Sequence, residues 1–212
     1  RFSQQLKGKK KAGIQTEIQN DLKNKGGKIL FQEDYLHLGS PEAVHMALSR
    51  LTKEKELVRL AKGIYLRQEI DPEIGPLLPS IEEIAEAIAE KEHVIIRPTG
   101  SYAMNKLGIS TQIPMKVVFL TDGQSRSIKI GRGRLTFKRV RPKLLGAKNN
   151  LVYLAIQALD ELGKQDDATQ EITFEKIRNA LEHVPKKEII EDAKFASQRV
   201  TRLLYYLASV TN

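Results

Sequence analysis

The sequence predicts an α+β protein with two domains, the first at residues 13–67 and the second at residues 80–212. The chain of 212 residues is long enough to bury two modest hydrophobic cores. On both sides of residues 68–79, helical periodicities of apolar residues alternate with short β-rich runs. The segment 68–79 itself contains three prolines and a glycine, which interrupt both patterns and predict a linker.

The first domain is predicted to be a series of helices that ends in a β-hairpin. The predicted elements are a helix at 14–27, a short helix at 31–38, a helix at 40–53 and a hairpin at 57–66. In the hairpin, two β-rich runs flank Ala61-Lys62-Gly63, where the glycine permits a tight turn. Helix, short helix, tight turn, helix and hairpin follow one another in a winged helix-turn-helix, which we therefore predict for this domain.

The helix at 40–53 is the predicted recognition helix. Ser40 offers its hydroxyl oxygen to the free N–H groups of the first turn, and Pro41 occupies the first helical position, where a missing N–H costs nothing. A stripe of apolar residues at helical spacing predicts burial of one side, formed by Val44, Ala47, Leu48 and Leu51. The polar residues lie elsewhere on the helix, so they are free to contact a partner.

The polar face of this helix and the hairpin supply the candidate DNA contacts of the first domain. We expect His45 and Ser49 to contact base edges, and Glu42 to accept from a cytosine amine or to favour the helix dipole. Basic side chains of the helix and hairpin are expected to contact phosphates. The candidates are Ser40, Glu42, His45, Ser49, Arg50, Lys53, Arg59 and Lys62. An amphipathic helix beside a hairpin also occurs in domains that never bind nucleic acid, and this alternative stays open.

The second domain is predicted to be a mixed α/β domain with a small sheet and several helices. The predicted elements are a helix from Ser80, a strand at 93–97, a helix at 100–108, a strand at 117–120 and a hairpin of 128–130 with 135–137. Three helices follow: the first is capped by Asn149 or Asn150, the second is capped by Thr173, and the third lies near 188–207. In the hairpin, apolar and basic residues alternate around Gly131 and Gly133, so we expect its basic side chains to point outwards.

Positive charge is concentrated in particular zones of the chain. The formal net charge of +9 and the isoelectric point near 9.6 suit a nucleic-acid partner. Residues 125–148 contain no acidic residue, and the candidate contacts here, which alternate as a phosphate-tracking surface would, are Arg132, Arg134, Lys138, Arg139 and Arg141. This zone can also meet an acidic protein or be only a solvated face. Residues 1–12 carry four lysines and form a basic arm that holds phosphates or has no role.

The sequence offers no arrangement typical of an enzyme, so we expect no catalytic residue, metal or cofactor. Gly100-Ser101 at a helix start is typical of nucleotidyltransferases, but that chemistry needs two carboxylates on a nearby strand, and Asp122 has no such neighbour. We expect Asp122 to be a turn residue and Ser101 a helix cap. The four histidines lack metal-ligand spacing, and phosphate-loop motifs are absent. The lack of cysteine fits a reducing cytoplasm, and no apolar run is long enough for a membrane span.

Three runs of sequence resemble a known family. They are LGSPEAVHMALSRLTKEKELVRLAKGIYL, LLPSIEEIAEAIAE and IIRPTGSYAMNKLGISTQIPMKVVFLTDGQSRSIKIGRGRLTFKRVRPKLLGAK. Over residues 14–204 the chain resembles the AbiEi-like antitoxins of type IV toxin–antitoxin systems, which cause abortive infection in phage defence. The runs PTGSYAMNKLGISTQIP and LTDG carry most of the specificity.

The resemblance implies a cytoplasmic protein with two roles. An N-terminal winged helix-turn-helix would bind double-stranded operator DNA and repress the antitoxin–toxin operon. The C-terminal domain would counteract a nucleotidyltransferase-like toxin, with or without direct contact. Residues 40–53 match the recognition helix of the family, and Arg59, Lys62 and Gly63 match its wing, whereas Glu56 stands where the family often has glycine. The alternative is a basic protein-binding module that engages an acidic toxin or another partner without specific DNA recognition.

Overall fold

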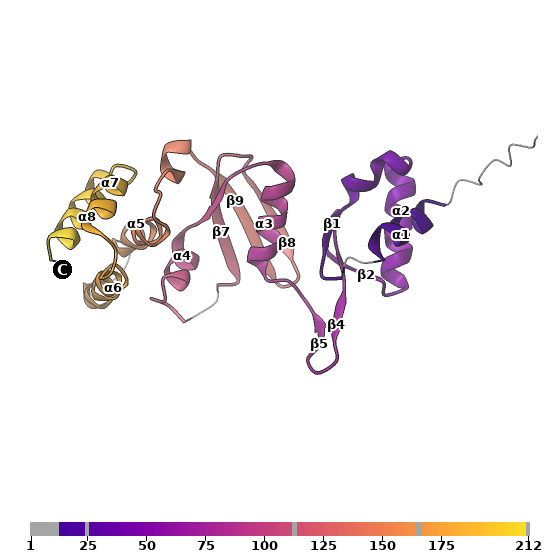
Figure 1. Ribbon diagram of the computed structural model, residues 1–212, viewed down its shortest axis with the longest axis horizontal. Helices are drawn as coiled ribbons and strands as arrows, with labels where there is room; N and C mark the ends of the chain where they lie inside the picture. Colours follow the sequence, from indigo (N-terminus) through magenta and orange to yellow (C-terminus); the bar gives the residue numbers. More distant parts are fainter. Residues whose placement is uncertain (1–12, 24–25, 112–113, 164–166, 211–212) are drawn as a thin grey trace, which may run out of the picture. The chain divides into compact units, whose positions relative to one another are not determined.

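The computed structural model describes four stretches of the chain, residues 13–23, 26–111, 114–163 and 167–210. The predicted basic arm at 1–12 lies outside these described residues. Helices and small sheets occur along the chain, which confirms the α+β class (Figure 1). The chain forms two compact units that divide between Ser80 and Ile81.

The first unit combines helices with two small sheets. Its elements are α1 (Ile14–Leu22), β1 (Ile29–Phe31), the 3-10 helix η1 (Gln32–Leu38), α2 (Pro41–Lys53), β2 (Leu57–Ala61), β3 (Ile64–Arg67), β4 (Glu69–Asp71) and β5 (Gly75–Leu77). The larger sheet is antiparallel with strand order β1-β3-β2. Phe31, which was predicted to begin a helix, is instead the last residue of β1 and lies opposite Ile64, because pairing with the distant β3 outweighs local preference.

The core of the first unit is built around α2. The stripe predicted from the sequence is confirmed, since Val44, Ala47, Leu48 and Leu51 are all buried. They pack with residues from α1, β1, η1, β2 and β3, namely Ile18, Leu22, Leu30, Tyr35, Leu57 and Tyr65. Burial of this one face leaves the opposite face of α2 in solvent, as expected for a helix with a narrow apolar stripe.

A turn at the end of α2 directs the chain into β2. Lys55 has a left-handed backbone conformation, with φ 60°. The N–H of Glu56 donates to the carbonyl of Leu51 at 3.0 Å, and that of Lys55 donates to the carbonyl of Thr52 at 3.2 Å, which together form a Schellman motif. The conformation that favours glycine therefore falls on Lys55, and Glu56 can differ from glycine without strain at its own position.

The segment predicted to be a linker that interrupts helix and strand, residues 68–79, contains a β-hairpin, so the predicted interruption of strand structure is wrong. β4 and β5 pair antiparallel with each other and with no other described strand, and Pro76 lies opposite Ile70. Proline is tolerated in such a hairpin because each strand of a two-stranded sheet is an edge, where an N–H that points away from the partner has no ladder hydrogen bond to lose. In the turn, the carboxylate of Asp71 accepts from the N–H groups of Glu73 and Ile74, and these hydrogen bonds lower the pKa of Asp71.

The second unit contains a four-stranded sheet followed by four helices. Its elements are α3 (Ile81–Glu92), β6 (Ile96–Pro98), α4 (Gly100–Lys106), β7 (Lys116–Thr121), β8 (Arg126–Ile130), β9 (Gly133–Arg139), the 3-10 helix η2 (Pro142–Leu145), α5 (Asn150–Leu162), α6 (Asp167–Ala180), α7 (Lys186–Ala193) and α8 (Gln198–Val210). The helices form a separate apolar core in which α5 is central, because most of its residues are buried.

The ends of the C-terminal helices differ from the sequence prediction. Asn149, rather than Asn150, caps α5, since its carboxamide oxygen accepts from two backbone N–H groups of the first turn. Thr173 lies inside α6 and is not its cap. The single helix predicted near 188–207 is two helices, α7 and α8, because the chain turns between them and the hydroxyl of Ser197 accepts from the N–H of Val200 at 3.4 Å.

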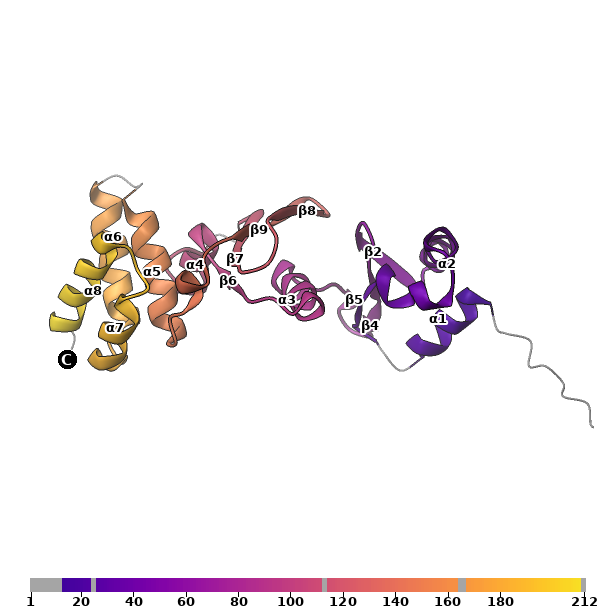
Figure 2. The same ribbon diagram turned by 90° about the horizontal axis from the view of Figure 1, so that it is seen from above.

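The sheet of the second unit has strand order β6-β7-β9-β8, and the predicted β8–β9 hairpin is confirmed. β7 and β9 are parallel, whereas the other neighbours are antiparallel. Helix α3 lies against one face of the sheet, as Figures 1 and 2 show. On that face, Glu92 of α3 pairs with Arg126, and a Cβ added to Gly133 would lie 2.9 Å from the side chain of Ile81. Glycine at 133 therefore allows the helix to approach the strand closely.

Candidate nucleic-acid interface

The solvent-facing side of α2 carries the predicted contacts of the first unit. Glu42, His45, Arg50 and Lys53 are exposed, and Ser49 is half-buried. Met46, which is not among the predicted contacts, also lies on this side with 53% exposure. The exposed side chain of Met46, next to His45, gives this surface an apolar element. The sequence indicates its exposure, because Met46 lies outside the buried stripe of α2.

Ser40 has a structural role at the start of α2. Its hydroxyl oxygen accepts from the N–H of Ala43 at 3.2 Å, which confirms the predicted N-cap. The carbonyl of Pro41 accepts from the side-chain amide of Gln32 at 3.2 Å. The contact from Gln32 fixes the N-terminal turn of α2 relative to η1, and the hydroxyl oxygen of Ser40 is engaged within the cap.

The β2–β3 hairpin places its two basic residues differently. Lys62 is exposed in the turn, next to Gly63, whose φ of 74° permits the tight reversal. Arg59 lies opposite Tyr65, and its Nε donates to the carbonyl of Ala61 at 3.4 Å across a register shift in the strand. The backbone turn therefore sets the position of Lys62, whereas the side chain of Arg59 is partly held by a hydrogen bond within the hairpin.

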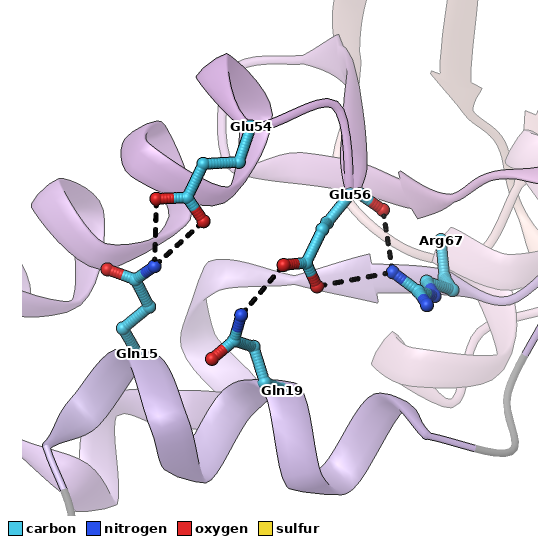
Figure 3. Close-up of polar contacts among 5 residues, drawn as sticks. All are labelled: Gln15, Gln19, Glu54, Glu56 and Arg67. Atoms are coloured by element: carbon cyan, nitrogen blue, oxygen red, sulfur yellow. Dashed lines mark hydrogen bonds and ion pairs between the residues drawn. The ribbon is translucent and has the colours of Figure 1, made fainter.

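Polar contacts brace α1 against the α2–β2 corner (Figure 3). The side-chain amide of Gln15 donates to both carboxylate oxygens of Glu54, at 2.9 and 3.2 Å. Gln19 donates to Glu56 at 2.7 Å, and Arg67 of β3 donates to the carbonyl of Glu56 and pairs with its carboxylate at 3.4 Å. Glu56 therefore joins α1 to β3, a role that no local pattern in the sequence could reveal.

The basic residues predicted in the β8–β9 region do not all share one surface. Arg134 lies opposite Lys129 of β8 and Lys116 of β7, so these three cations stand side by side on the face of the sheet opposite to α3. Lys138 is four residues further along β9 on the same face.

The other three predicted residues lie elsewhere, so the prediction that all five alternate along the strands is wrong. Arg132 is in the β8–β9 turn, Arg139 has the opposite strand parity to Arg134, and Arg141 follows the end of β9. The reason is that strand alternation requires even spacing, and the run of basic residues continues past the strand.

The residues weighed for catalysis have structural contacts. A carboxylate oxygen of Asp122 accepts from the N–H of Ile95 at 2.8 Å, which ties β6 to the end of β7. Ser101 is the second residue of α4, and Thr99 is at the N-cap position, so the prediction that Ser101 is a cap is wrong. His93 has φ 54° and closes α3 in the same manner as Lys55 closes α2. Within the described residues, no group of three acidic, histidine or cysteine side chains could hold a metal ion.

Comparison with models of protein families gives a match over most of the chain. The sequence model of a family of unknown function matches residues 14–189, which include parts of both units. No curated protein matches the chain. Among the described residues, the structure contains no helix with the length and apolar character needed to cross a bilayer.

Proposed function

Since the chain belongs to DUF6088, a family of unknown function, we propose from its own residues that it is a DNA-binding repressor with an N-terminal winged helix-turn-helix. The observation that carries the proposal is the arrangement of the first unit, where α1, η1 and α2 precede the β2–β3 hairpin and the sheet order is β1-β3-β2. The second helix of a helix-turn-helix enters the major groove. The corresponding helix here is α2, whose exposed side carries His45, Arg50 and Lys53.

The resemblance to AbiEi-like antitoxins extends this proposal to the second unit. In this proposal, the protein represses its own toxin–antitoxin operon and counteracts a nucleotidyltransferase-like toxin through residues 81–212, in the cytoplasm, during phage defence. The support is the match of the PTGSYAMNKLGISTQIP and LTDG runs, which lie in the second unit. The proposal includes no catalytic reaction, metal or cofactor.

A second candidate function is a basic protein-binding module that engages an acidic toxin. It is favoured by the cations of the sheet, which would pair with carboxylates as well as with phosphates. Binding of duplex DNA at several salt concentrations separates the two functions, because a DNA-binding protein releases counterions and its affinity falls steeply with salt. Absence of salt-sensitive duplex binding by the full chain would leave the protein-binding module as the better proposal.

The hairpin tip is expected to contribute affinity that does not depend on sequence. Replacing Lys62 by alanine should reduce the magnitude of the negative slope of log affinity against log salt by about 0.9, the value for one lost phosphate contact. The measurement is fluorescence anisotropy of a labelled operator duplex over a range of salt concentrations. Lys28→Ala, which removes an exposed lysine outside the hairpin and α2, is the matched control. An unchanged slope for Lys62→Ala would mean that the tip does not touch DNA.

A second, nonspecific DNA contact is proposed for the open face of the four-stranded sheet. Like charges directly opposite one another destabilise a sheet, yet Lys129, Arg134 and Lys116 form such a row. No acidic partner for these three side chains is present in the parts of the chain that the structure describes. A bound phosphate would relieve their repulsion, so the row supports a second, nonspecific contact that helps to bend or clamp the operator DNA.

Charge reversal near this row tests the second contact. The double substitution Arg132→Glu/Arg134→Glu should weaken duplex binding and reduce the magnitude of the salt slope by at least about 0.9, the value for the one phosphate contact that Arg134 makes from the row. Lys186→Glu/Arg202→Glu changes the net charge equally on exposed helical positions of the same unit and is the control. Both variants are compared with the unchanged chain by anisotropy and by repression of an operator-driven reporter. Normal repression and slope in the first variant would assign the row to a protein partner.

A further inference from the structure

We infer that a pocket between η2 and the α7–α8 turn binds a nucleoside polyphosphate, a ligand class beyond the proposed DNA-binding function. The pocket has a volume of about 510 Å³, within the range typical of small-molecule sites. Its cationic lining comes from Arg139, Arg141 and Lys143, and its apolar lining includes Leu144 and Phe195. All of these residues belong to the second unit.

The cationic side of the pocket is complementary to a ligand with several negative charges. No acidic residue lines the pocket. Within the described residues, no carboxylate pairs with Arg139, Arg141 or Lys143. Arginine presents a planar fork of donors that matches phosphate oxygens, whereas lysine acts as a point charge. Three uncompensated cations within one pocket therefore fit a chain of phosphates better than a single carboxylate.

The apolar side of the pocket is complementary to a ligand that also has a flat apolar part. The ring of Phe195 lies on the backbone at Gly146, where an added Cβ would be 2.6 Å from the ring, so glycine is required for this packing. Leu144 is 43% exposed beside it. The Nζ of Lys194 lies 5.0 Å from the centre of the Phe195 ring, which adds positive charge at the rim. A nucleobase would cover this apolar surface while its phosphates meet the cations.

The same chemistry is available from a free nucleotide or from the 5′-triphosphate end of an unpaired RNA strand. Duplex DNA does not offer it, because its bases are stacked within the helix and only their edges are open. The ligand is therefore distinct from the operator. The two proposals can therefore be refuted separately. A chain that does not bind nucleotide could still bind DNA through its first unit, and a chain that does not bind DNA could still bind nucleotide in this pocket.

Isothermal titration calorimetry of the full chain tests the pocket with ATP, tripolyphosphate, adenosine and a short single-stranded RNA bearing a 5′-triphosphate. ATP should bind with a micromolar dissociation constant, and tripolyphosphate should bind about tenfold more weakly, since it lacks the base that covers the apolar side. Binding of ATP supports a free nucleotide as the ligand, whereas binding of the RNA alone supports a strand end. Equal affinity for ATP and tripolyphosphate, or no binding of any probe, would overturn the proposal.

Single substitutions locate the binding. Arg141→Glu should lower the affinity for ATP by about tenfold or more, because a charge-assisted contact becomes a repulsion. Lys186→Glu makes the same charge change at an exposed position outside the pocket, and the affinity should stay within about twofold of that of the unchanged chain. Leu144→Gln, at an exposed position, should weaken ATP but not tripolyphosphate. Equal losses in Arg141→Glu and Lys186→Glu would show a general charge effect and refute the pocket.

Discussion

Replacing Leu48 by alanine is expected to lower the free energy of unfolding of the first unit by about 2–5 kcal/mol and to abolish duplex binding at physiological temperature. Leu48 has 0% exposure on the inner side of α2, and its loss would leave a cavity among residues of α1 and the sheet. A small domain is stable by only about 5–15 kcal/mol, so this loss is large. Chemical denaturation followed by circular dichroism measures it.

The two-unit organisation supplies an internal reference for this experiment. The transition of the second unit should keep its midpoint in Leu48→Ala, because its core residues are separate from those of the first. Met46→Ala is the matched control on the same helix, since Met46 is 53% exposed and its truncation should cost less than about 0.5 kcal/mol. If Leu48→Ala and Met46→Ala were equally stable, α2 would not be packed as described.

Replacing His45 or Ser49 by alanine is expected to change which operator sequence the protein prefers, by about 1–3 kcal/mol for each lost base contact. Both residues are on the solvent-facing side of α2, with His45 the more exposed. The measurement is competition binding with a set of duplexes that differ by single base pairs. A lost base contact should affect duplexes with the recognised base and spare those that already lack it.

A phosphate contact gives the opposite pattern and serves as the comparison. Lys53→Ala, at the end of α2, should weaken binding to every duplex by a similar factor, since the backbone carries no sequence information. If His45→Ala and Ser49→Ala also weakened all duplexes equally, another face of α2 would be the one that reads the bases. Met46 would then be the first residue to test.

The parts of the fold that depend on neighbouring residues were predictable from the sequence. The cap at Ser40 and the buried stripe of α2 follow from residues within one or two turns, and the β8–β9 hairpin follows from alternation around two glycines. Strand β1 was missed because its three residues gain their structure only from pairing with β3. The β4–β5 hairpin could not be predicted because proline usually interrupts a strand, whereas an edge strand accepts it.

Some features of the candidate interface also follow from neighbouring residues, whereas others depend on contacts between distant parts of the chain. Exposure of the α2 residues could be predicted, since a helix that buries one stripe must expose the rest. The brace from Gln19 through Glu56 to Arg67 joins residues that are distant in sequence, so no periodicity marks it. The basic residues after β8 were correctly recognised as a charged zone, but their faces depend on where β9 ends. That end is set by tertiary pairing with β7, which the sequence does not display.

The position of β9 between β7 and β8 has a consequence for how the second unit folds. β8 follows β7 in the chain but does not pair with it, and both pair with β9, which is made last. The antiparallel β8–β9 pair can form by local closure in microseconds, whereas parallel alignment with β7 requires a longer loop to close first. We therefore expect the β8–β9 hairpin to form first and to add to β7 as a preformed ribbon. Docking places Lys116 of β7 beside Arg134 of β9, so we expect this step to be slower than closure of the hairpin.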